Sequence, residues 1–400
     1  MNVNAVSRCL PGFDHDCKTI KVLFLDYQFR SLGGLETYNM ETVRAFQRLG
    51  VNMQVWSCFT SGNQVLQGIP TSGLAPLNSR WSKLYQRFWR LHLCLRLIRE
   101  QPQVDLVIVG HVFLVCQGLW WAHRRNIPCW LLVFGVDIWN PLPLPFNRAI
   151  SHCDRIVAVS GYTARRAAAL LPDTKRRLSV IHPAVDTARF RPSPVTNFDF
   201  PKVVLTVARL SAGERYKGHE LVILALPTVR EALGESIEYW VVGTGDDRPR
   251  LESLASRCGV SDSVRFLGRV DDNQLLDCYQ RCHVFAMPSF VTQRSDGFHT
   301  GEGFGIVYLE ASACAKPVLA ANEGGQTEAV RHGETGLLVK PTVTEVAQGL
   351  IALLGNPELS KAMGRNGRKF VEQDFTMAHF EARWRVLLKE SFPQLFESAS

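Results

Sequence analysis

The stretch Gly301-Glu302-Gly303-Phe304-Gly305-Ile306-Val307-Tyr308-Leu309-Glu310 is the most informative part of this chain. It places one carboxylate, Glu302, in a glycine-rich loop and a second, Glu310, in a following apolar segment that predicts a helix. Glycines let the backbone approach a ligand closely, and the free N–H groups of a helix start favour an anion. If the whole stretch were helical, the two carboxylates would lie about 12 Å apart along the axis. That separation is too large for two acids acting on one atom, but it suits the two ends of an elongated anionic ligand such as a nucleotide-sugar.

Short glycine-containing motifs accompany this stretch in both halves of the chain. The first half contains Gly33-Gly34-Leu35-Glu36, Phe134-Gly135-Val136-Asp137, Ala158-Val159-Ser160 and His182-Pro183-Ala184-Val185-Asp186. The second half contains Val207-Ala208-Arg209-Leu210, Tyr216-Lys217-Gly218-His219, Val242-Gly243-Thr244-Gly245, Phe266-Leu267-Gly268 and Gly324-Gly325-Gln326-Thr327-Glu328. In this order, with Glu302 and Glu310 matching a Glu-x7-Glu signature, the motifs span residues 19–375 and resemble the retaining glycosyltransferases of family 4 (group 1).

Strand-like and helix-like segments alternate twice along the chain, the pattern of parallel α/β sheets. The proline-containing segment 191–198 separates the two halves and predicts a linker. The resemblance implies an α/β fold of GT-B architecture, in which two Rossmann-like parallel-sheet domains enclose the active site in the cleft between them. We expect an N-terminal acceptor domain over 1–195, a C-terminal donor domain over 200–375, and a terminal helix over 376–398 that crosses back to the first domain.

Positive charge is concentrated in the first half. Residues 1–200 hold 23 Lys and Arg against 12 Asp and Glu, or +11, and residues 201–400 hold the remaining 22 against 25, or −3. Such asymmetry indicates a polyanionic partner, either anionic lipid or nucleic acid, unless it arises by chance. With the resemblance, the expected partner is an anionic membrane surface and not nucleic acid, and the expected location is the cytoplasmic side, peripheral at the inner face of the cell membrane.

The segment 83–100 predicts a helix with two apolar strips separated by basic residues. One strip contains Leu84, Phe88, Leu91, Leu95 and Ile98, and the other contains Tyr85, Trp89, Leu93 and Leu97. One strip is expected to pack on the domain. The other, the strip with Trp89, either touches a membrane surface or makes a second core contact.

The resemblance implies a role for each site residue. Arg209 and Lys217 would bind the diphosphate, which Gly33 and Gly34 approach from the other domain, and Gly243 lies near the donor. Glu302 would bind the transferred sugar and Glu310 the ribose, while the backbone of Phe304, Ile306 and Val307, with Gly303 and Gly305, would donate to sugar and phosphate. His111, after the strand 104–109, would lie near the donor sugar and the attacking hydroxyl. The residues expected to be catalytic are therefore His111, Glu302, Arg209 and Lys217, whereas His182 and His219 are interpreted as structural.

Neither a cofactor nor a metal site is expected. The turn at 242–246 lacks the third glycine of a dinucleotide fingerprint and follows the second strand of its half, which argues against NAD. The chain has 11 cysteines without a Cys-x-x-Cys pair, and Cys278, Cys282 and His283 lack a second ligand pair. These cysteines are therefore interpreted as the free thiols of a cytosolic protein.

The expected reaction transfers a mannose- or glucose-type hexosyl residue with retention, from a nucleoside diphosphate sugar to a saccharide acceptor that is lipid-linked. GDP-mannose is the first candidate donor and a UDP-hexose the second, in surface polysaccharide or glycolipid synthesis. The alternatives are a sugar phosphorylase, a nucleotide-sugar epimerase, or a non-catalytic nucleotide-sugar binding protein. Two features depart from the family pattern: Ala184 replaces a glycine, and the polar loop 290–300 before Glu302 is longer than usual.

Overall fold

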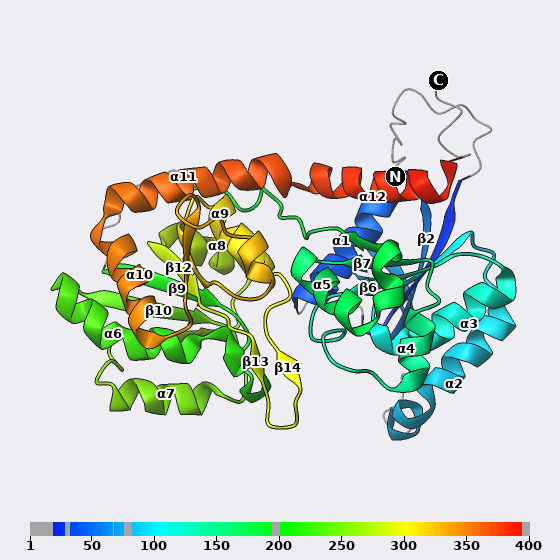
Figure 1. Ribbon diagram of the computed structural model, residues 1–400, viewed down its shortest axis with the longest axis horizontal. Coiled ribbons are helices and arrows are strands. Elements are labelled where there is room, and N and C mark those ends of the chain that lie inside the picture. The colour runs from blue at the N-terminus through cyan, green and yellow to red at the C-terminus, as the bar shows by residue number, and fades with distance from the viewer. Residues whose placement is uncertain (1–18, 29–32, 67, 76–81, 194–200, 394–400) are drawn as a thin grey trace, which may run out of the picture.

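The computed structural model describes residues 19–28, 33–66, 68–75, 82–193 and 201–393, with the side chains of 82–87 excepted. It contains two separate sheets of largely parallel strands, each with helices on both faces (Figure 1). Most of the predicted linker 191–198, and the last residues of the predicted helix 376–398, lie outside the described residues.

The first sheet has the strand order β3-β4-β2-β1-β5-β6-β7-β8. Only the β3–β4 pair is antiparallel. The central strands of this first sheet are continuous apolar runs because helices cover both faces of the sheet. The strands are β1 (Lys21–Asp26), β2 (Asn52–Ser61), β3 (Asn63–Leu66), β4 (Ile69–Ala75), β5 (Leu106–Val109), β6 (Cys129–Val133), β7 (Arg155–Ala158) and β8 (Leu178–Val180).

The second sheet is entirely parallel, in the order β11-β10-β9-β12-β15-β16. Strands β11 and β16 form the two edges of this sheet. The strands are β9 (Lys202–Val207), β10 (Ile237–Val242), β11 (Val264–Gly268), β12 (Val284–Met287), β15 (Val318–Ala321) and β16 (Gly336–Val339).

The helices of each domain divide between the two faces of its sheet. Helices α2 (Ser82–Glu100), α3 (Val115–Arg125), α4 (Leu144–Ile150) and α5 (Gly161–Leu170) contribute to one core of the first domain, while α1 (Gly34–Arg48) packs on the opposite face. In the second domain, α6 (His219–Leu233), α7 (Arg248–Arg257) and α10 (Val343–Gly355) share one core. Helices α8 (Asp272–Arg281), α9 (Ile306–Ala313) and α11 (Pro357–Asp374) pack on the other face.

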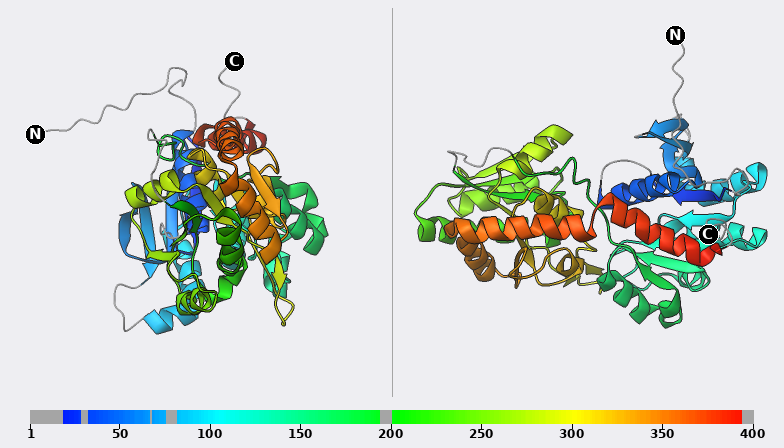
Figure 2. Two further views of the ribbon diagram at one scale, coloured as in Figure 1. Left: turned by 90° about the vertical axis from the view of Figure 1, so that its left-hand side faces the viewer. Right: turned by 90° about the horizontal axis from the view of Figure 1, so that it is seen from above.

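Helix α12 (Met377–Ser391) follows α11 almost end to end and lies on the first domain (Figure 2). Its Trp384 ring lies 5.2 Å from the Phe46 ring of α1 and stacks on Trp130 of β6 at 6.4 Å. Glu381 of α12 pairs with Arg48 of α1 at 2.6 Å. The chain thus crosses between its two halves twice.

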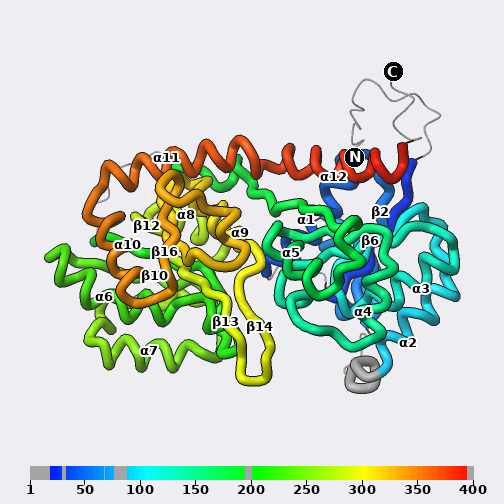
Figure 3. Tube along the Cα trace, viewed as in Figure 1, coloured from blue at the N-terminus to red at the C-terminus, as the bar shows by residue number. Residues whose placement is uncertain are grey.

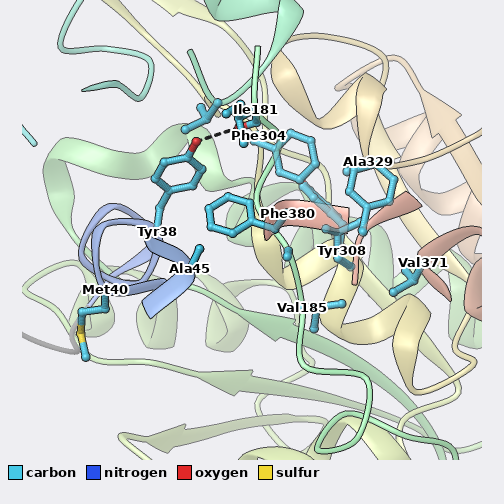
Figure 4. Close-up of a cluster of buried hydrophobic side chains, with 14 of the residues drawn as sticks. Tyr38, Met40, Ala45, Ile181, Val185, Phe304, Tyr308, Ala329, Val371 and Phe380 are labelled. Carbon is cyan, nitrogen blue, oxygen red and sulfur yellow. Dashed lines mark hydrogen bonds between the residues drawn. The ribbon is translucent and has the colours of Figure 1, made fainter. Parts of the chain in front are cut away.

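One hydrophobic core runs without interruption from the first domain into the second. Tyr38 of α1 and Phe380 of α12 lie in the same cluster as Phe304, which precedes α9, and Tyr308 in the first turn of α9 (Figure 4). The Tyr38 hydroxyl donates to the carbonyl of Ile181 at 2.9 Å. This core places the glycine-rich loop 301–305 at the boundary between the domains.

The packing of α2 corrects the sequence interpretation of its two strips. Trp89, Leu93 and Leu97 are buried in the first domain's core, so the strip with Trp89 is the packed one. Of the other strip, Phe88, Leu91, Leu95 and Ile98 are exposed, by 47%, 57%, 56% and 45% respectively. Trp89 packs edge-on against Tyr27 and Phe59, ring contacts that require the tertiary fold and that a helical wheel does not contain.

The loop 290–300 forms a short hairpin, β13 (Thr292–Gln293) and β14 (His299–Thr300), beside the boundary between the domains (Figure 3). The Asn140 amide of the first domain holds β14 through two hydrogen bonds: its Nδ2 donates to the His299 carbonyl at 3.0 Å, and its Oδ1 accepts from the His299 N–H at 2.6 Å. The hairpin therefore belongs to the second domain in sequence and is bonded to the first domain in space.

Candidate active site

The glycine-rich loop ends where α9 begins, at Ile306. Glu302 therefore lies in the loop and Glu310 on the helix, and the helical spacing assumed for the whole stretch does not apply between 302 and 305. Gly305 is the residue before the helix and has φ +84°, a left-handed conformation in which an added Cβ would also lie 2.4 Å from the Tyr308 ring. No side chain of the described residues caps the N-terminus of α9. The backbone N–H groups of Ile306 and Val307, in the first turn next to the loop, therefore have no side-chain cap.

Glu302 forms a close ion pair with Lys217. Lys217 Nζ lies 2.5 Å from Glu302 Oε2, and the two side chains are only 15% and 13% exposed. Burial would lower the pKa of Lys217, but the charge of Glu302 and the hydrogen bond to it raise that pKa to about 12. Lys217 ends the 3₁₀ turn η4 (Ala212–Lys217), and α6 begins two residues later at His219, so the lysine lies just before that helix.

Arg209 lies just beyond the carboxyl end of β9, where parallel α/β sheets bind ligands. Its side chain is 66% exposed, and its guanidinium pairs with Glu214 at 2.6 Å. Gly243 sits against this segment, since an added Cβ would lie 2.0 Å from the Ala208 carbonyl oxygen. The structure thus brings Gly243 next to Arg209, and brings Lys217 to Glu302.

Glu310 points from α9 to α8. The Tyr279 hydroxyl donates to Glu310 Oε2 at 2.7 Å. Burial raises the pKa of Glu310, and the hydrogen bond from Tyr279 together with the charge of Arg189 opposes that rise. Phe304 is buried and packs against the rings of His182 and Phe375, so only its backbone can face a ligand.

The first domain approaches the glycine-rich loop through backbone contacts. An added Cβ on Gly303 would lie 1.8 Å from the Phe134 carbonyl oxygen, and Gly135, with φ +151°, faces the same glycine. The Ser160 hydroxyl donates to the Gly303 carbonyl at 2.6 Å. Gly303 is therefore required because two segments of the other domain pass directly over it.

Glu328 joins the two domains, a contact that the sequence analysis did not anticipate. Its carboxylate accepts hydrogen bonds from the backbone N–H groups of Gly161 and Tyr162, both at 2.7 Å, at the start of α5. His182 Nε2 lies 2.8 Å from the same carboxylate. Burial would raise the pKa of Glu328, but these hydrogen bonds lower it. Ser160 and Glu328 each belong to one of the short motifs of the sequence analysis. No signal in the sequence indicated, however, that these residues contact the opposite domain.

His111 lies at the carboxyl end of β5 and caps the short 3₁₀ turn η2 (Val112–Leu114). Its Nδ1 accepts the Phe113 N–H at 3.2 Å, and burial lowers its pKa to about 4. The imidazole is therefore neutral and carries its proton on Nε2, which makes it a hydrogen-bond donor. This geometry suits donation to a substrate oxygen, not the removal of a proton.

Gly33 and Gly34 form the start of α1. Gly33 has an extended backbone and makes no side-chain cap, and Glu36 lies in the first turn. The structure places these glycines and His111 in the first domain, whereas Arg209, Lys217, Glu302 and Glu310 belong to the second. His219 is buried, and burial lowers its pKa to about 4.

Among the described residues, no group of three or more His, Cys, Asp and Glu side chains is arranged to hold a metal ion. Cys278 and Cys282 are buried free thiols. Within the described part of the chain, every helix is too short or too polar to span a membrane.

Two protein families match the chain in sequence. Residues 192–370 match the family described as glycosyl transferases group 1, and residues 32–189 match glycosyltransferase family 4. A GDP-mannose-dependent alpha-(1-6)-phosphatidylinositol monomannoside mannosyltransferase from Mycobacterium tuberculosis is 36% identical over 242 residues, which cover 58% of this chain and 62% of that protein. A D-inositol 3-phosphate glycosyltransferase from Gordonia bronchialis is 30% identical over 72% of this chain and 62% of its own length. The chain thus matches less than two thirds of the length of either relative.

Solved structures share the architecture at low sequence identity. HepE from Anabaena in complex with UDP has a TM-score of 0.74 at 19% identity, covering 93% of this chain and 100% of that one. Sucrose-phosphate synthase from Thermosynechococcus elongatus has a TM-score of 0.72 at 19% identity, covering 94% and 100%. With both halves matched in sequence and both domains matched in structure, the chain belongs to the glycosyltransferases of family 4 (group 1) and has the GT-B fold.

Proposed function

We propose that this protein transfers a hexosyl residue, of mannose or glucose type, from a nucleoside diphosphate sugar to a saccharide acceptor with retention of configuration. The observation that carries the proposal is the Lys217–Glu302 pair beside the uncapped start of α9, directly under the first domain. It combines a cation for the diphosphate, a carboxylate for sugar hydroxyls and backbone N–H groups in one place.

In the proposed reaction, the bond between the anomeric carbon and the diphosphate oxygen breaks on the face where the acceptor oxygen attacks. Arg209, Lys217 and the N–H groups of α9 stabilise the charge that grows on the leaving diphosphate. A diphosphate oxygen takes the acceptor's proton as the new glycosidic bond forms. His111 donates from Nε2 to the sugar or to the attacking hydroxyl, and Glu310 binds the ribose. This chemistry requires no bound metal ion and no resident cofactor.

GDP-mannose is the proposed donor, and a UDP-hexose is the second candidate. The mannosyltransferase relatives are named for GDP-mannose, whereas HepE was crystallised with UDP and with UDP-glucose. The proposed acceptor is a lipid-linked saccharide in surface polysaccharide or glycolipid synthesis, which is in keeping with the phosphatidylinositol monomannoside in the relatives' names.

We further propose that the first domain docks on an anionic membrane at the cytoplasmic face. The exposed strip of α2, formed by Phe88, Leu91, Leu95 and Ile98, supplies the apolar contact. Arg99, whose side chain is 79% exposed although it also lies 3.3 Å from Glu100, and the +11 charge of residues 1–200 supply attraction to anionic lipid. Arg96 contributes less, because it pairs with Glu100 and lies over the Trp56 ring.

A panel of nucleotide-sugars tests the donor assignment through thermal stabilisation, followed by product analysis. A donor present at 100 times its dissociation constant should stabilise the protein by about 2.7 kcal/mol. Transfer to a saccharide with a retained anomeric configuration is the expected product. Release of sugar phosphate by orthophosphate would indicate a phosphorylase, and conversion of the nucleotide-sugar alone an epimerase. Stabilisation without any turnover would indicate a binding protein.

A further inference from the structure

A polar pair lies buried beneath His111, where the proposed reaction gives it no direct part. Asp26, the last residue of β1, is 1% exposed, and Asn39 of α1 is fully buried. Asn39 Nδ2 donates to Asp26 Oδ1 at 2.6 Å and to the Gly110 carbonyl oxygen at 3.1 Å. One amide group therefore connects β1, α1 and the end of β5.

The orientation of the Asn39 amide follows from its partners. The exchanged orientation would place Oδ1 against two acceptors, the Asp26 carboxylate and the Gly110 carbonyl, so Nδ2 must face them. In this orientation Asn39 Oδ1 has no hydrogen-bond partner within the described parts of the chain. Burying polar groups in an apolar core is costly, and here Asn39 carries that cost while it bonds to Gly110, the residue preceding His111.

Gly110 fits closely into the space that this pair leaves. Its N–H donates to the Leu25 carbonyl at 2.8 Å, and its own carbonyl accepts from Asn39. An added Cβ would lie 2.8 Å from Asn39 Nδ2 and 2.9 Å from the Phe24 ring. The peptide leading into His111 is thus held on three sides, and the His111 backbone begins the turn whose Phe113 N–H fixes Nδ1.

We propose that Asp26 and Asn39 are positioning residues that hold the Gly110–His111 peptide and thereby aim the His111 imidazole at the reacting sugar. Asn39 lies on α1, the helix that begins at Gly33-Gly34, so the same amide fixes the distance between the glycine loop and His111. This inference rests on the proposed function, because His111 acts only in that reaction.

The decisive experiment is a double-mutant cycle between Asn39→Ala and His111→Ala, with kcat and the donor KM measured in the full-length protein. A displacement of about 1 Å in a catalytic group can lower a rate on the order of 100-fold. Asn39→Ala should therefore lower kcat about 10- to 100-fold while changing the donor KM less than about threefold. In the His111→Ala background, the same substitution should lower kcat less than about twofold, since nothing is left to position.

A swapped pair separates positioning from folding. In Asp26→Asn/Asn39→Asp, assayed at pH 9 so that the carboxyl group at 39 is ionised, the two side chains can still hydrogen-bond, but the carboxylate offers no donor to the Gly110 carbonyl. Burial raises the pKa of Asp26 to about 7, so a neutral group at position 26 resembles a form that the native protein can adopt. The swap should recover melting temperature relative to Asn39→Ala while kcat stays low. Thr42→Val is the control. Thr42 is buried on the same helix, and among the described residues its hydroxyl bonds only to the Tyr38 carbonyl of its own helix, so kcat should be unchanged.

Three results would overturn the proposal. Full recovery of kcat in the swapped pair would show that only the contact between positions 26 and 39 matters. Independent, multiplicative losses in the cycle would show a structural role unrelated to His111. An unchanged kcat in His111→Ala would remove the role of His111 itself, whereas failure of the whole proposed function would appear separately, as absence of donor binding in the native protein.

Discussion

Replacement of Lys217 by methionine should weaken nucleoside diphosphate binding and destabilise the fold, and the two effects can be separated. At the 2.5 Å separation of Lys217 Nζ and Glu302 Oε2, an effective dielectric constant near 20 gives an attraction of about 7 kcal/mol, much of which offsets desolvation. Removal of one partner leaves the other buried and unpaired, at a typical cost of about 3–5 kcal/mol.

The pH dependence gives a second estimate of the stability that the Lys217–Glu302 pair contributes. The pKa of Lys217 rises from 10.5 to about 12 in the folded protein, which corresponds to about 2 kcal/mol of stability. Because the folded pKa is the higher one, this contribution is fully present below pH 10.5 and is lost as the pH rises through about 12. The free energy of unfolding of Lys217→Met, measured by denaturant titration, should therefore be about 2–5 kcal/mol lower than that of the native protein at pH 8. The difference should be smaller near pH 12.

Calorimetric titration with GDP and UDP measures the second effect. Loss of a buried charge-assisted contact to the diphosphate should cost about 2–3 kcal/mol, or roughly 30- to 150-fold in affinity. Lys217→Met/Glu302→Gln should recover much of the lost stability, because no unpaired charge remains, but should not recover affinity for the diphosphate. Arg209→Ala is the matched control for charge: its side chain is 66% exposed, so affinity should fall with little change in stability.

Unchanged GDP and UDP affinity in Lys217→Met would refute the diphosphate assignment. Additive losses of stability in the double variant would refute the coupling between Lys217 and Glu302. Affinity is measured by calorimetric titration and stability by denaturant unfolding, so either prediction can be refuted while the other holds.

Three further outcomes are expected. Glu214→Gln should tighten nucleoside diphosphate binding several-fold by calorimetry, because Glu214 holds Arg209 at 2.6 Å in the free protein and competes with the diphosphate; weaker binding would mean that Glu214 orients Arg209 for the ligand. Turnover should persist in excess EDTA, and a loss of activity that magnesium or manganese restores would contradict the metal-free mechanism. Leu91→Asp/Leu95→Asp should reduce flotation with anionic vesicles at least several-fold, and flotation should fall with salt; Val386→Asp, at an equally exposed position on α12, should not reduce it, and equal loss in both would place the membrane surface elsewhere.

The sequence by itself determined the architecture. The strand–helix alternation predicted two parallel sheets because buried parallel strands are continuous apolar runs, which β5 and β6 illustrate. The glycines of 301–305 predicted a close approach of the backbone to a ligand, which stays a prediction. The close contact that the structure shows at Gly303 is with the Phe134 carbonyl of the first domain, where a Cβ would not fit. The roles of Glu302, Glu310, Arg209 and Lys217 came from the resemblance, and they remain predictions until the variants are measured.

Only the tertiary structure decided which groups meet. The Lys217–Glu302 pair and the Glu328 contact with the start of α5 join residues far apart in the chain. Such pairs leave no periodic trace in a sequence, because spacing encodes only neighbours along one helix or strand. The same limit explains the wrong prediction of which strip of α2 packs on the domain, because both apolar strips have helical periodicity. The aromatic contacts of Trp89 with Tyr27 and Phe59 select the buried strip, and those partners come from β1, β2 and their loops, which the wheel of one helix cannot contain.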